Sequence, residues 1–419
     1  MGIAFIVFVA VAVAACSPSG ATPPTSTVET TTVETTVEFE DGVLQIGVLL
    51  PLSGAGTEIG SSMRDAIELA VEEIGEAGGV MNRPISLLVE DEGEDAATAL
   101  VSLDKLMARG VDAIIGPASS LIAPQILPIT IAGDVLTCSP TASAMSLDGY
   151  PDSGLFVRTI PSDSLQAIAI ARAIEQTGKP TAAITFVDDA FGRPFAEVVS
   201  NELDRQGITV VESLGFDPAD TEYADEAAIV LATGANVVAV IGDSRAGPRM
   251  VESLFDTTDD GEVEIIINDA MRVPATASTY ARLADEDRAV LSGVSPQSRI
   301  ANEALRERFA EAYPDSRGLF ATYAYDCVNL IALAANASQS TRATTIAQRV
   351  PSVADVGTPC ATFALCDMGL QADRNINYEG PSGVLQIDSN GDPIRGVFDR
   401  FVFDSAGRDE VESSLVMTG

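Results

Sequence analysis

Residues 116–143 have the sequence GPASSLIAPQILPITIAGDVLTCSPTAS, and they contain two short hydroxyl-rich loops, 117–120 and 139–143. Each loop follows a brief apolar run that predicts a strand, 113–115 and 135–137. If these strands are neighbours in one parallel sheet, both loops open at the same edge of that sheet. Their hydroxyls and the free N–H groups at the following helix starts then form a binding site for an anion or a carboxylate. The alternative is that the hydroxyls only cap those helices.

The composition indicates a globular protein large enough for two lobes. The chain has 419 residues, of which 46% are hydrophobic and 20% are charged. Its formal net charge of −37 argues against nucleic acid as a partner, because the phosphates would repel such a chain. Acidity of this degree is typical of a highly soluble surface, including one in salty surroundings.

The sequence contains no histidine, which narrows the chemistry that the chain can carry out. Ser-His-Asp triads, Cys-His pairs, histidine-containing zinc motifs and acid–base catalysis by histidine all need that residue. A GxxxxGK[ST] phosphate-binding motif is also absent from the sequence. We therefore expect no catalytic residue, no bound metal and no cofactor.

The first 40 residues predict an exported protein with a lipid anchor. Residues 3–15 are apolar but too few to span a bilayer, and they end in the sequence VAAC (13–16). This ending resembles the lipobox of bacterial lipoproteins, although no lysine or arginine precedes the apolar run. We expect residues 1–16 to be a lipoprotein signal peptide with Cys16 as the lipidation site. Residues 17–40, rich in Thr, Pro, Ser, Glu and Val, are expected to form a disordered tether.

From residue 43 onward, short buried strands alternate with amphipathic helices that end at glycines. The alternation restarts after residue 160, so it predicts two doubly wound α/β lobes, each built on a parallel sheet from right-handed βαβ units. The expected strands of the two sets are 43–50, 85–89, 113–115 and 135–137, then 181–187, 208–213, 236–241, 263–267 and 290–294.

Near the C-terminus, Asn390-Gly391 predicts a tight turn between two apolar runs. The runs are 384–387 and 397–403, and a turn of this type joins the strands of a hairpin.

Four cysteines remain in an exported chain once Cys16 carries lipid. Cys360 and Cys366 are close enough to close a small loop, and we expect a disulfide between them. Cys138 and Cys327 are either a second disulfide or two small buried thiols.

Taken together, these segments resemble the type I periplasmic binding proteins, specifically the branched-chain amino acid (Leu/Ile/Val) group of ABC-transporter receptors. The resemblance covers residues 44–403, and the motifs are specific as an ordered set, whereas any one alone is weak. The motifs are IGVLLPLSGAGTEIG (46–60), AIELAVEEIGEAGGVMNRPISLLVEDE (66–92), IIGPASS (114–120), SPTAS (139–143), VRTIPSD (157–163), DDAFGR (188–193) and TYAYDCVNL (322–330).

The resemblance implies a clamshell in which the chain crosses between two lobes three times, through a three-strand hinge. It places lobe one at 43–160 plus 292–376, and lobe two at 161–291 plus 377–419. Ligands of open parallel sheets lie at the carboxyl ends of the strands. Both hydroxyl-rich loops are expected there, on lobe one.

Matched residue by residue, the resemblance assigns the polar groups of the ligand to lobe one. Ser120 matches the serine that binds the ligand carboxylate. Thr141 matches the residue whose carbonyl accepts from the ligand ammonium. Ser143 matches the residue whose hydroxyl and N–H contact the ligand.

On lobe two, Phe191 matches the aromatic residue that closes over the ligand, and Asp269 matches the acid that pairs with the ammonium. Asp243 or Ser244 falls where another contact is expected. Phe191 is alternatively a core aromatic, and Asp269 a surface cap. Ile59 occupies a position where an aromatic residue is common in amino-acid receptors, so we expect the pocket for the ligand's side chain to be altered. Amides, urea-like compounds and other small carboxylates therefore remain alternative ligands.

The resemblance implies a monomeric, non-enzymatic receptor, anchored by lipid on the outer face of the cytoplasmic membrane. It would capture an amino acid or a similar small polar ligand and deliver it to the permease of an ABC importer. One alternative is a sensor of amides or urea-like ligands that serves signalling. Another is an NAD-dependent enzyme, because GAGTEIG (54–60) follows a strand, but its spacing is GxGxxxG rather than GxGxxG.

Overall fold

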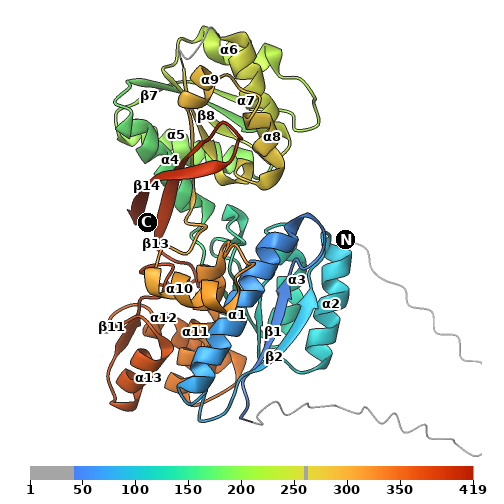
Figure 1. Ribbon diagram of the computed structural model, residues 1–419, viewed down its shortest axis with the longest axis vertical. Helices are drawn as coiled ribbons and strands as arrows, with labels where there is room; N and C mark the ends of the chain where they lie inside the picture. Colours follow the sequence, from blue (N-terminus) through green and yellow to red (C-terminus); the bar gives the residue numbers. More distant parts are fainter. Residues whose placement is uncertain (1–41, 259–262, 419) are drawn as a thin grey trace, which may run out of the picture. The chain divides into compact units, whose positions relative to one another are not determined.

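The computed structural model of the protein describes residues 42–258 and 263–418 (Figure 1). The expected signal peptide, the lipidation site Cys16 and the tether 17–40 lie outside these residues. The described residues belong to one unit of the chain, Glu38–Gly419. None of the helices in this part of the chain has the length and apolar character needed to cross a bilayer.

The first lobe is built on a five-stranded parallel sheet in the order β2-β1-β3-β4-β5. Side chains of β1 alternate between its two faces, so Val48 packs with the helices α1 and α11, whereas Leu49 packs with α2 and α3. The strands are β1 (Gln45–Leu50), β2 (Ser86–Asp91), β3 (Ala113–Ile115), β4 (Leu136–Ser139) and β5 (Phe156–Arg158). The helices are α1 (Thr57–Glu76), α2 (Ala96–Ala108), α3 (Ala123–Ala132) and α11 (Ala321–Ser338).

Local signals explain where these helices form. Met63, Ile67 and Ile74 of α1 are buried on one helical face, at the spacing of an amphipathic helix. Asp95 caps α2 by accepting the N–H of Thr98.

The second lobe is built on a seven-stranded sheet in the order β14-β13-β10-β9-β8-β6-β7. Its first five strands along the chain pair in parallel, and β13 and β14 are antiparallel additions at one edge. The strands are β6 (Thr181–Val187), β7 (Thr209–Phe216), β8 (Val237–Ile241), β9 (Glu264–Asn268), β10 (Leu291–Pro296), β13 (Arg395–Phe403) and β14 (Asp409–Thr418).

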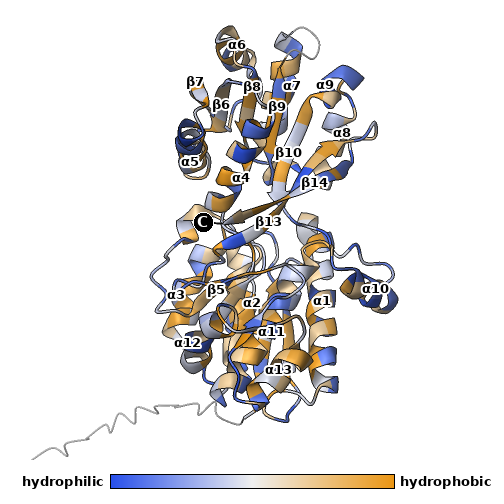
Figure 2. Cartoon of the chain, turned by 90° about the vertical axis from the view of Figure 1, so that its left-hand side faces the viewer, coloured by the Kyte–Doolittle hydropathy of each residue, from blue (hydrophilic) through white to orange (hydrophobic). Residues whose placement is uncertain are grey.

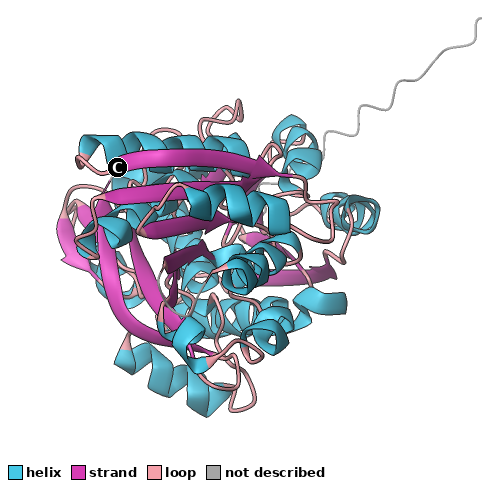
Figure 3. Cartoon of the chain, turned by 90° about the horizontal axis from the view of Figure 1, so that it is seen from above, coloured by secondary structure: helices cyan, strands magenta, loops and turns pink. Residues whose placement is uncertain are grey.

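Helices cover both faces of this second sheet, and β8 and β9 at its centre are coloured mainly as hydrophobic in Figure 2. One face packs against α4 (Asp163–Gln176) and α5 (Gly192–Arg205). The other face packs against α6 (Ala224–Ala232) and α7 (Ala246–Thr257). Two short helices, α8 (Ala277–Tyr280) and α9 (Asp285–Ala289), precede β10. Figure 3 shows helices and strands in separate colours, and the alternation gives the expected doubly wound α/β architecture.

The rest of the chain adds three helices and a small parallel sheet, in which β11 pairs with β12. These elements are α10 (Glu303–Ala312), α12 (Ala343–Val353), β11 (Thr358–Cys360), α13 (Phe363–Gln371) and β12 (Ile376–Tyr378). Their apolar side chains join the core of the first lobe.

Two of the expected boundaries between the lobes are wrong. β10 belongs to the second sheet through Pro296, so the chain leaves the second lobe after that residue and not at 291. Tyr378, Leu385 and Ile387 are buried in the core of the first lobe, so residues 377–394 belong there too. The third crossing therefore lies just before β13 and not at 376/377.

The predicted C-terminal hairpin is also wrong in its pairing. Asn390 and Gly391 do form a turn, but only an isolated bridge between Ile387 and Pro393 accompanies it. The long hairpin instead joins β13 to β14 across residues 404–408, where Asp404 accepts the N–H groups of the turn.

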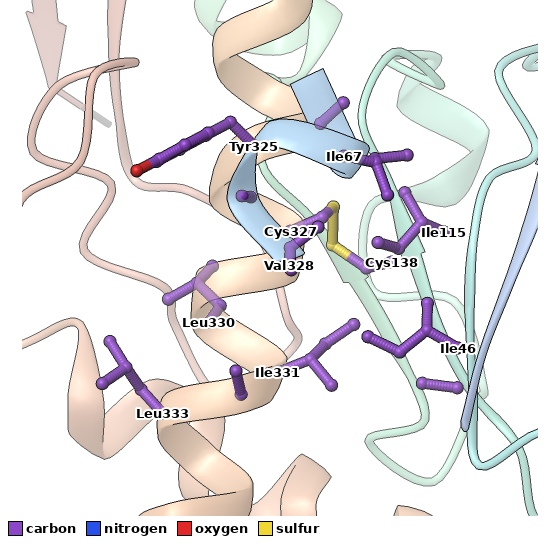
Figure 4. Close-up of a cluster of buried hydrophobic side chains, with 14 of the residues drawn as sticks. Ile46, Ile67, Ile115, Cys138, Tyr325, Cys327, Val328, Leu330, Ile331 and Leu333 are labelled. Carbon is purple, nitrogen blue, oxygen red and sulfur yellow. A yellow bond between two sulfur atoms is a disulfide. The ribbon is translucent and has the colours of Figure 1, made fainter. Parts of the chain in front are cut away.

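Two disulfides hold the first lobe. Cys138 on β4 is bonded to Cys327 on α11, deep in the core beside Ile46 and Ile115 (Figure 4). The second joins Cys360 to Cys366. From the sequence, Cys138 and Cys327 could form either a disulfide or two buried thiols, and in the structure they form the disulfide.

Candidate ligand-binding site

The two hydroxyl-rich loops lie side by side at the carboxyl edge of the first sheet. Their strands β3 and β4 are parallel neighbours, so residues 116–120 and 139–143 emerge at the same edge. Three hydrogen bonds join the loops: Ser139 Oγ donates to Pro117 O at 2.7 Å, Thr141 Oγ1 donates to Ala118 O at 3.0 Å, and Ala144 N donates to Ser120 Oγ at 3.2 Å.

Gly116 allows the first loop to begin where it does. Its φ of 123° is unfavourable for other residues, and a Cβ there would lie against the carbonyl oxygen of Leu49. The loop therefore turns directly over the end of β1.

The expected set of free N–H groups is only partly present. The N–H groups of Ala118 and Ser119 already donate to the carboxylate of Glu92, at 2.7 and 2.9 Å. The prediction of a general anion-binding site made of loop amides is wrong for these two positions. The hydroxyl of Ser120 is half-buried at the end of the same loop.

A fully buried arginine forms hydrogen bonds with the backbone of the second loop. Arg158 on β5 is 0% exposed and forms ion pairs with Asp148 at 2.6 Å and Asp392 at 2.7 Å. Its guanidinium also donates to the carbonyls of Ala142 (3.4 Å) and Ala144 (3.2 Å), which flank Ser143. The ion pairs neutralise the buried charge, and the carbonyl bonds fix the backbone on both sides of Ser143.

Two acids meet where the chain first enters the second lobe. Asp163 at the start of α4 is buried, its N–H donates to Ser143 O at 2.9 Å, and its carboxyl group hydrogen-bonds the Ser143 side chain. Burial raises the pKa of Asp163 well above its usual value, and the nearby charge of Asp269 raises it further. Burial also raises the pKa of Asp269, which follows β9. Ser143 and Asp269 are thus brought together around Asp163.

Gln166 completes this polar group from the next turn of α4. Its Nε2 donates to Asp269 Oδ1 at 2.9 Å and to Val294 O at 2.8 Å. Its Oε1 is buried and has no hydrogen-bond partner. The buried carboxyl group of Asp163, the half-buried one of Asp269 and the unpaired amide oxygen are suited to a cation, because a cation would compensate two negative charges that otherwise repel each other.

The sequence did not identify Asp163, Gln166, Glu92 or Arg158 as site residues. Asp163 and Gln166 lie at the start of α4, where Ser162 is the cap and accepts the N–H of Ser164. The available signal was the acid that ends the motif VRTIPSD (157–163), but a local pattern does not show burial.

The remaining predicted residues of the second lobe have different surroundings. Phe191 is half-buried against Phe195, with ring centroids 5.7 Å apart, and also packs against both cores of the second lobe. Ser244 is exposed, and Asp243 caps α7 by accepting the N–H groups of Arg245 and Ala246. Neither Ser244 nor Asp243 takes part in the hydrogen bonds described around Asp163, Gln166 and Asp269.

A cavity of about 620 Å³ opens beside Asp269. The apolar side chains of Ile59 and Phe320 line this cavity together with the charged side chains of Arg272 and Asp409. Arg272 is held by Asp409 at 2.8 Å and lies 4.7 Å from the centre of the Phe401 ring. Ile59 therefore lines the same cavity as Asp269.

The glycine-rich stretch 54–60 does not form a pyrophosphate-binding loop. Gly54–Gly56 form a 3₁₀ turn, and the N–H of Ala55 donates to the carboxylate of Glu94 at 2.8 Å. A carboxylate at this position would repel a pyrophosphate, so the geometry disfavours the dinucleotide alternative.

These features define a two-lobed binding protein with a polar site at the junction of its lobes, and comparison with known proteins gives its family. The sequence model of the family described as "Periplasmic binding protein" matches residues 43–391. The chain belongs to this family, and the expected resemblance is confirmed. It is a solute-binding receptor, of a family of exported receptors and not of enzymes.

Three similar proteins illustrate the relationship. The chemotactic signal transduction system substrate-binding protein BasB of Halobacterium salinarum is 27% identical over 368 residues, covering 84% of this chain and 85% of that protein. The Leu/Ile/Val-binding protein BraC3 of Rhizobium johnstonii is 24% identical over 215 residues, covering 51% and 58%. The crystal structure of an ABC transporter substrate-binding protein from Desulfitobacterium hafniense, in complex with Leu, has a TM-score of 0.68 at 22% identity and covers 88% of this chain and 99% of that one. The last comparison shows the shared fold.

Proposed function

We propose that this protein captures an amino acid, or a closely related small zwitterion, between its two lobes and delivers it to the permease of an ABC importer. The observation that carries the proposal is the contact of Ser143 with Asp163, whose carboxyl group feels the charge of Asp269, while Ser120 is bonded to the neighbouring Ala144. Hydroxyl donors and paired carboxyl groups in one place match the two charges of an amino-acid head group. Two similar proteins support the same ligand class: one is named a Leu/Ile/Val-binding protein, and the other was crystallised in complex with Leu.

In this proposal the ligand carboxylate lies on the first lobe. The hydroxyl of Ser120 and the N–H of Ser143 donate to it, the Ser143 hydroxyl being bonded to Asp163, and the carbonyl of Thr141 accepts from the ammonium. Each charge-assisted hydrogen bond contributes about 1.5–3 kcal/mol.

The ligand ammonium lies between Asp163 and Asp269, with the free oxygen of Gln166 as a further acceptor. A cation here restores the ordinary, ionised state of both acids, because its charge opposes the burial that raises their pKa values. An ammonium without such a carboxylate partner would be too costly to bury.

The ligand side chain occupies the cavity beside Asp269, against Ile59 and Phe320. Phe191 covers the ligand from the second lobe, and Ser244 stays a proposed outer contact. Closure of the lobes is a population shift, in which the ligand stabilises the closed form only because it contacts both lobes. The receptor carries out no reaction on the ligand.

The cellular setting follows from the N-terminal sequence. Lipidation at Cys16 and the tether 17–40 would hold a monomeric receptor at the outer face of the cytoplasmic membrane. Mass spectrometry of the native protein tests this: a diacylglycerol-modified Cys16 supports the anchor, and an unmodified cysteine contradicts it.

A sensor for signalling is the second candidate, and one observation favours it. BasB, which matches 84% of this chain, is named as part of a chemotactic signal transduction system. The two candidates share the binding site and differ in the membrane partner. Deleting the gene would abolish ligand uptake if the protein serves a permease, whereas it would abolish the directed response to the ligand and spare uptake if it is a sensor.

A ligand screen tests the proposed function most simply. Thermal-shift assays against amino acids, their amides, urea and small carboxylates, followed by titration calorimetry, should find binding confined to compounds with both an ammonium and a carboxylate. Binding of amides or urea alone would redirect the proposal to the sensor of amide-like ligands. Stabilisation by NAD without any amino acid would overturn it.

A further inference from the structure

Glu92 is a buried carboxylate directly behind the first binding loop. It follows β2, is 1% exposed, and each of its oxygens accepts one backbone N–H of the loop: Ala118 N at 2.7 Å and Ser119 N at 2.9 Å. Glutamate is rarely buried without a cation, yet within residues 42–258 and 263–418 the charged group that acts on its carboxyl group is Asp91, which is also negative. Burial raises the pKa of Glu92 to about 7.

The position of these hydrogen bonds gives Glu92 a role in binding. Ala118 and Ser119 immediately precede Ser120, and the Ala118 carbonyl also accepts from Thr141 Oγ1 of the second loop. The carboxylate thus fixes the turn that presents Ser120 and, through Ala118, the contact between the loops. A hydroxyl or amide side chain cannot accept both N–H groups through two equivalent oxygens.

We propose that Glu92 is a positioning residue that also determines specificity: it holds residues 117–120 in the shape that binds the ligand, and its buried negative charge excludes ligands that carry a net negative charge. This inference rests on the proposed binding role of Ser120. Neither the family match nor the similar proteins assign a role to Glu92.

The charge effect distinguishes two kinds of ligand. A carboxylate bound at Ser120 without an ammonium places a second negative charge near Glu92, and Asp163 and Asp269 offer it no compensation. For charges about 8 Å apart at an effective dielectric constant of about 20, the repulsion weakens binding roughly thirtyfold. A zwitterion brings its own cation and is largely spared.

The test compares L-leucine with 4-methylpentanoate, which is leucine without its amino group. Titration calorimetry at pH 8.5, where Glu92 is ionised, gives the ratio of the two affinities for the wild type and for Glu92→Gln. Glutamine removes the charge and leaves one N–H of the loop unpaired, and the loop effect cancels in the ratio. We expect leucine to bind about threefold to tenfold more weakly, and the preference for leucine over 4-methylpentanoate to fall by about tenfold or more.

Two further variants separate charge from shape. Glu92→Asp keeps the charge but shortens the side chain, so both affinities should fall while the ratio stays at its wild-type value. Glu90→Gln is the matched control, because Glu90 lies two residues earlier, on β2, forms an ion pair with Lys105, and its replacement changes the net charge equally. It should alter neither affinity nor ratio.

Hydrogen exchange of the ligand-free protein provides a readout that does not depend on leucine. Peptides that cover residues 116–122 should exchange faster in Glu92→Gln and Glu92→Asp than in the wild type or Glu90→Gln, with the rest of the lobe unchanged. Unchanged exchange, or an equal loss of both affinities in Glu92→Gln, overturns the role of Glu92. If the wild type binds neither compound, leucine is not the ligand, and the amino acid found by the screen is compared with its own analogue that lacks the amino group; the exchange result decides in either case whether Glu92 holds the loop.

Discussion

Replacing Arg158 by methionine should destabilise the protein strongly and weaken ligand binding at the same time. The variant Arg158→Met keeps much of the volume but removes a charge that is 0% exposed and paired with Asp148 and Asp392. Breaking a buried pair on one side costs about 3–5 kcal/mol, because the remaining acids stay buried without a partner. Loss of the bonds to the carbonyls of Ala142 and Ala144 would also release the backbone around Ser143.

Urea unfolding at pH 7.5 measures the loss of stability, and titration calorimetry measures the loss of affinity. Arg193→Met is the matched control, since Arg193 is 64% exposed and pairs with Asp188 at 2.5 Å on the surface. We expect this control to change the free energy of unfolding by less than about 1 kcal/mol. A loss in Arg158→Met no larger than in the control would refute the reasoning.

A double variant isolates the pair itself. Arg158→Met combined with Asp392→Asn removes the buried positive charge together with one of the acids it leaves unpaired. The double variant should be at least about 1 kcal/mol more stable than the sum of the two single losses predicts. Strict additivity would mean that the two groups do not interact.

Two other predictions concern stability. Replacing Cys138 and Cys327 together by alanine should lower the free energy of unfolding by about 5 kcal/mol, because this disulfide closes a loop of 189 residues in the unfolded chain. The same change at Cys360 and Cys366, which are only 6 residues apart, should lower it by about 2 kcal/mol. Urea unfolding under oxidising conditions compares the two variants, and equal losses would contradict an origin in the entropy of loop closure. Asp326 is fully buried, and burial raises its pKa to about 7, so the folded state binds a proton that the unfolded state has already released. Stability should therefore fall as pH rises from about 4 to about 7, and Asp326→Asn should reduce that fall by about 4 kcal/mol; an unchanged pH profile would show that Asp326 is ionised throughout.

The positions of the two hydroxyl-rich loops could be predicted because local patterns carry the necessary information. Apolar runs of strand length precede Gly116 and Ser139, and parallel strands in a doubly wound sheet place both loops at one edge. That geometry brings Ser120, Thr141 and Ser143 to one edge, whereas their contacts with a ligand are implied by the resemblance and stay predictions. The same reasoning explains why the fold class was correct.

Residues whose roles depend on burial could not be found in this way. Glu92, Arg158 and Asp163 look like surface charges in sequence, since charged side chains are mostly exposed. Each becomes buried only because segments far apart in the chain come together, as Arg158 does with Asp392. No local periodicity reports such contacts.

Boundaries failed where tertiary packing outweighs regular structure. Leu385 and Ile387 alternate like a strand, but they enter the first-lobe core from an irregular segment. β14 was missed because it lies at the edge of its sheet, where exposed polar residues such as Glu410 and Glu412 replace the buried alternation of a central strand.

The central claim is that Ser120 and Asp269 hold the two charges of one ligand. Titration calorimetry with the best amino-acid ligand of the screen, on the wild type, Ser120→Ala and Asp269→Ala, tests it most directly, with Ser119→Ala as the control from the same loop. The account predicts losses of roughly tenfold to a hundredfold for both site variants, an unchanged control and unchanged thermal unfolding of the free proteins. Affinities within twofold of the wild type for both site variants would contradict it.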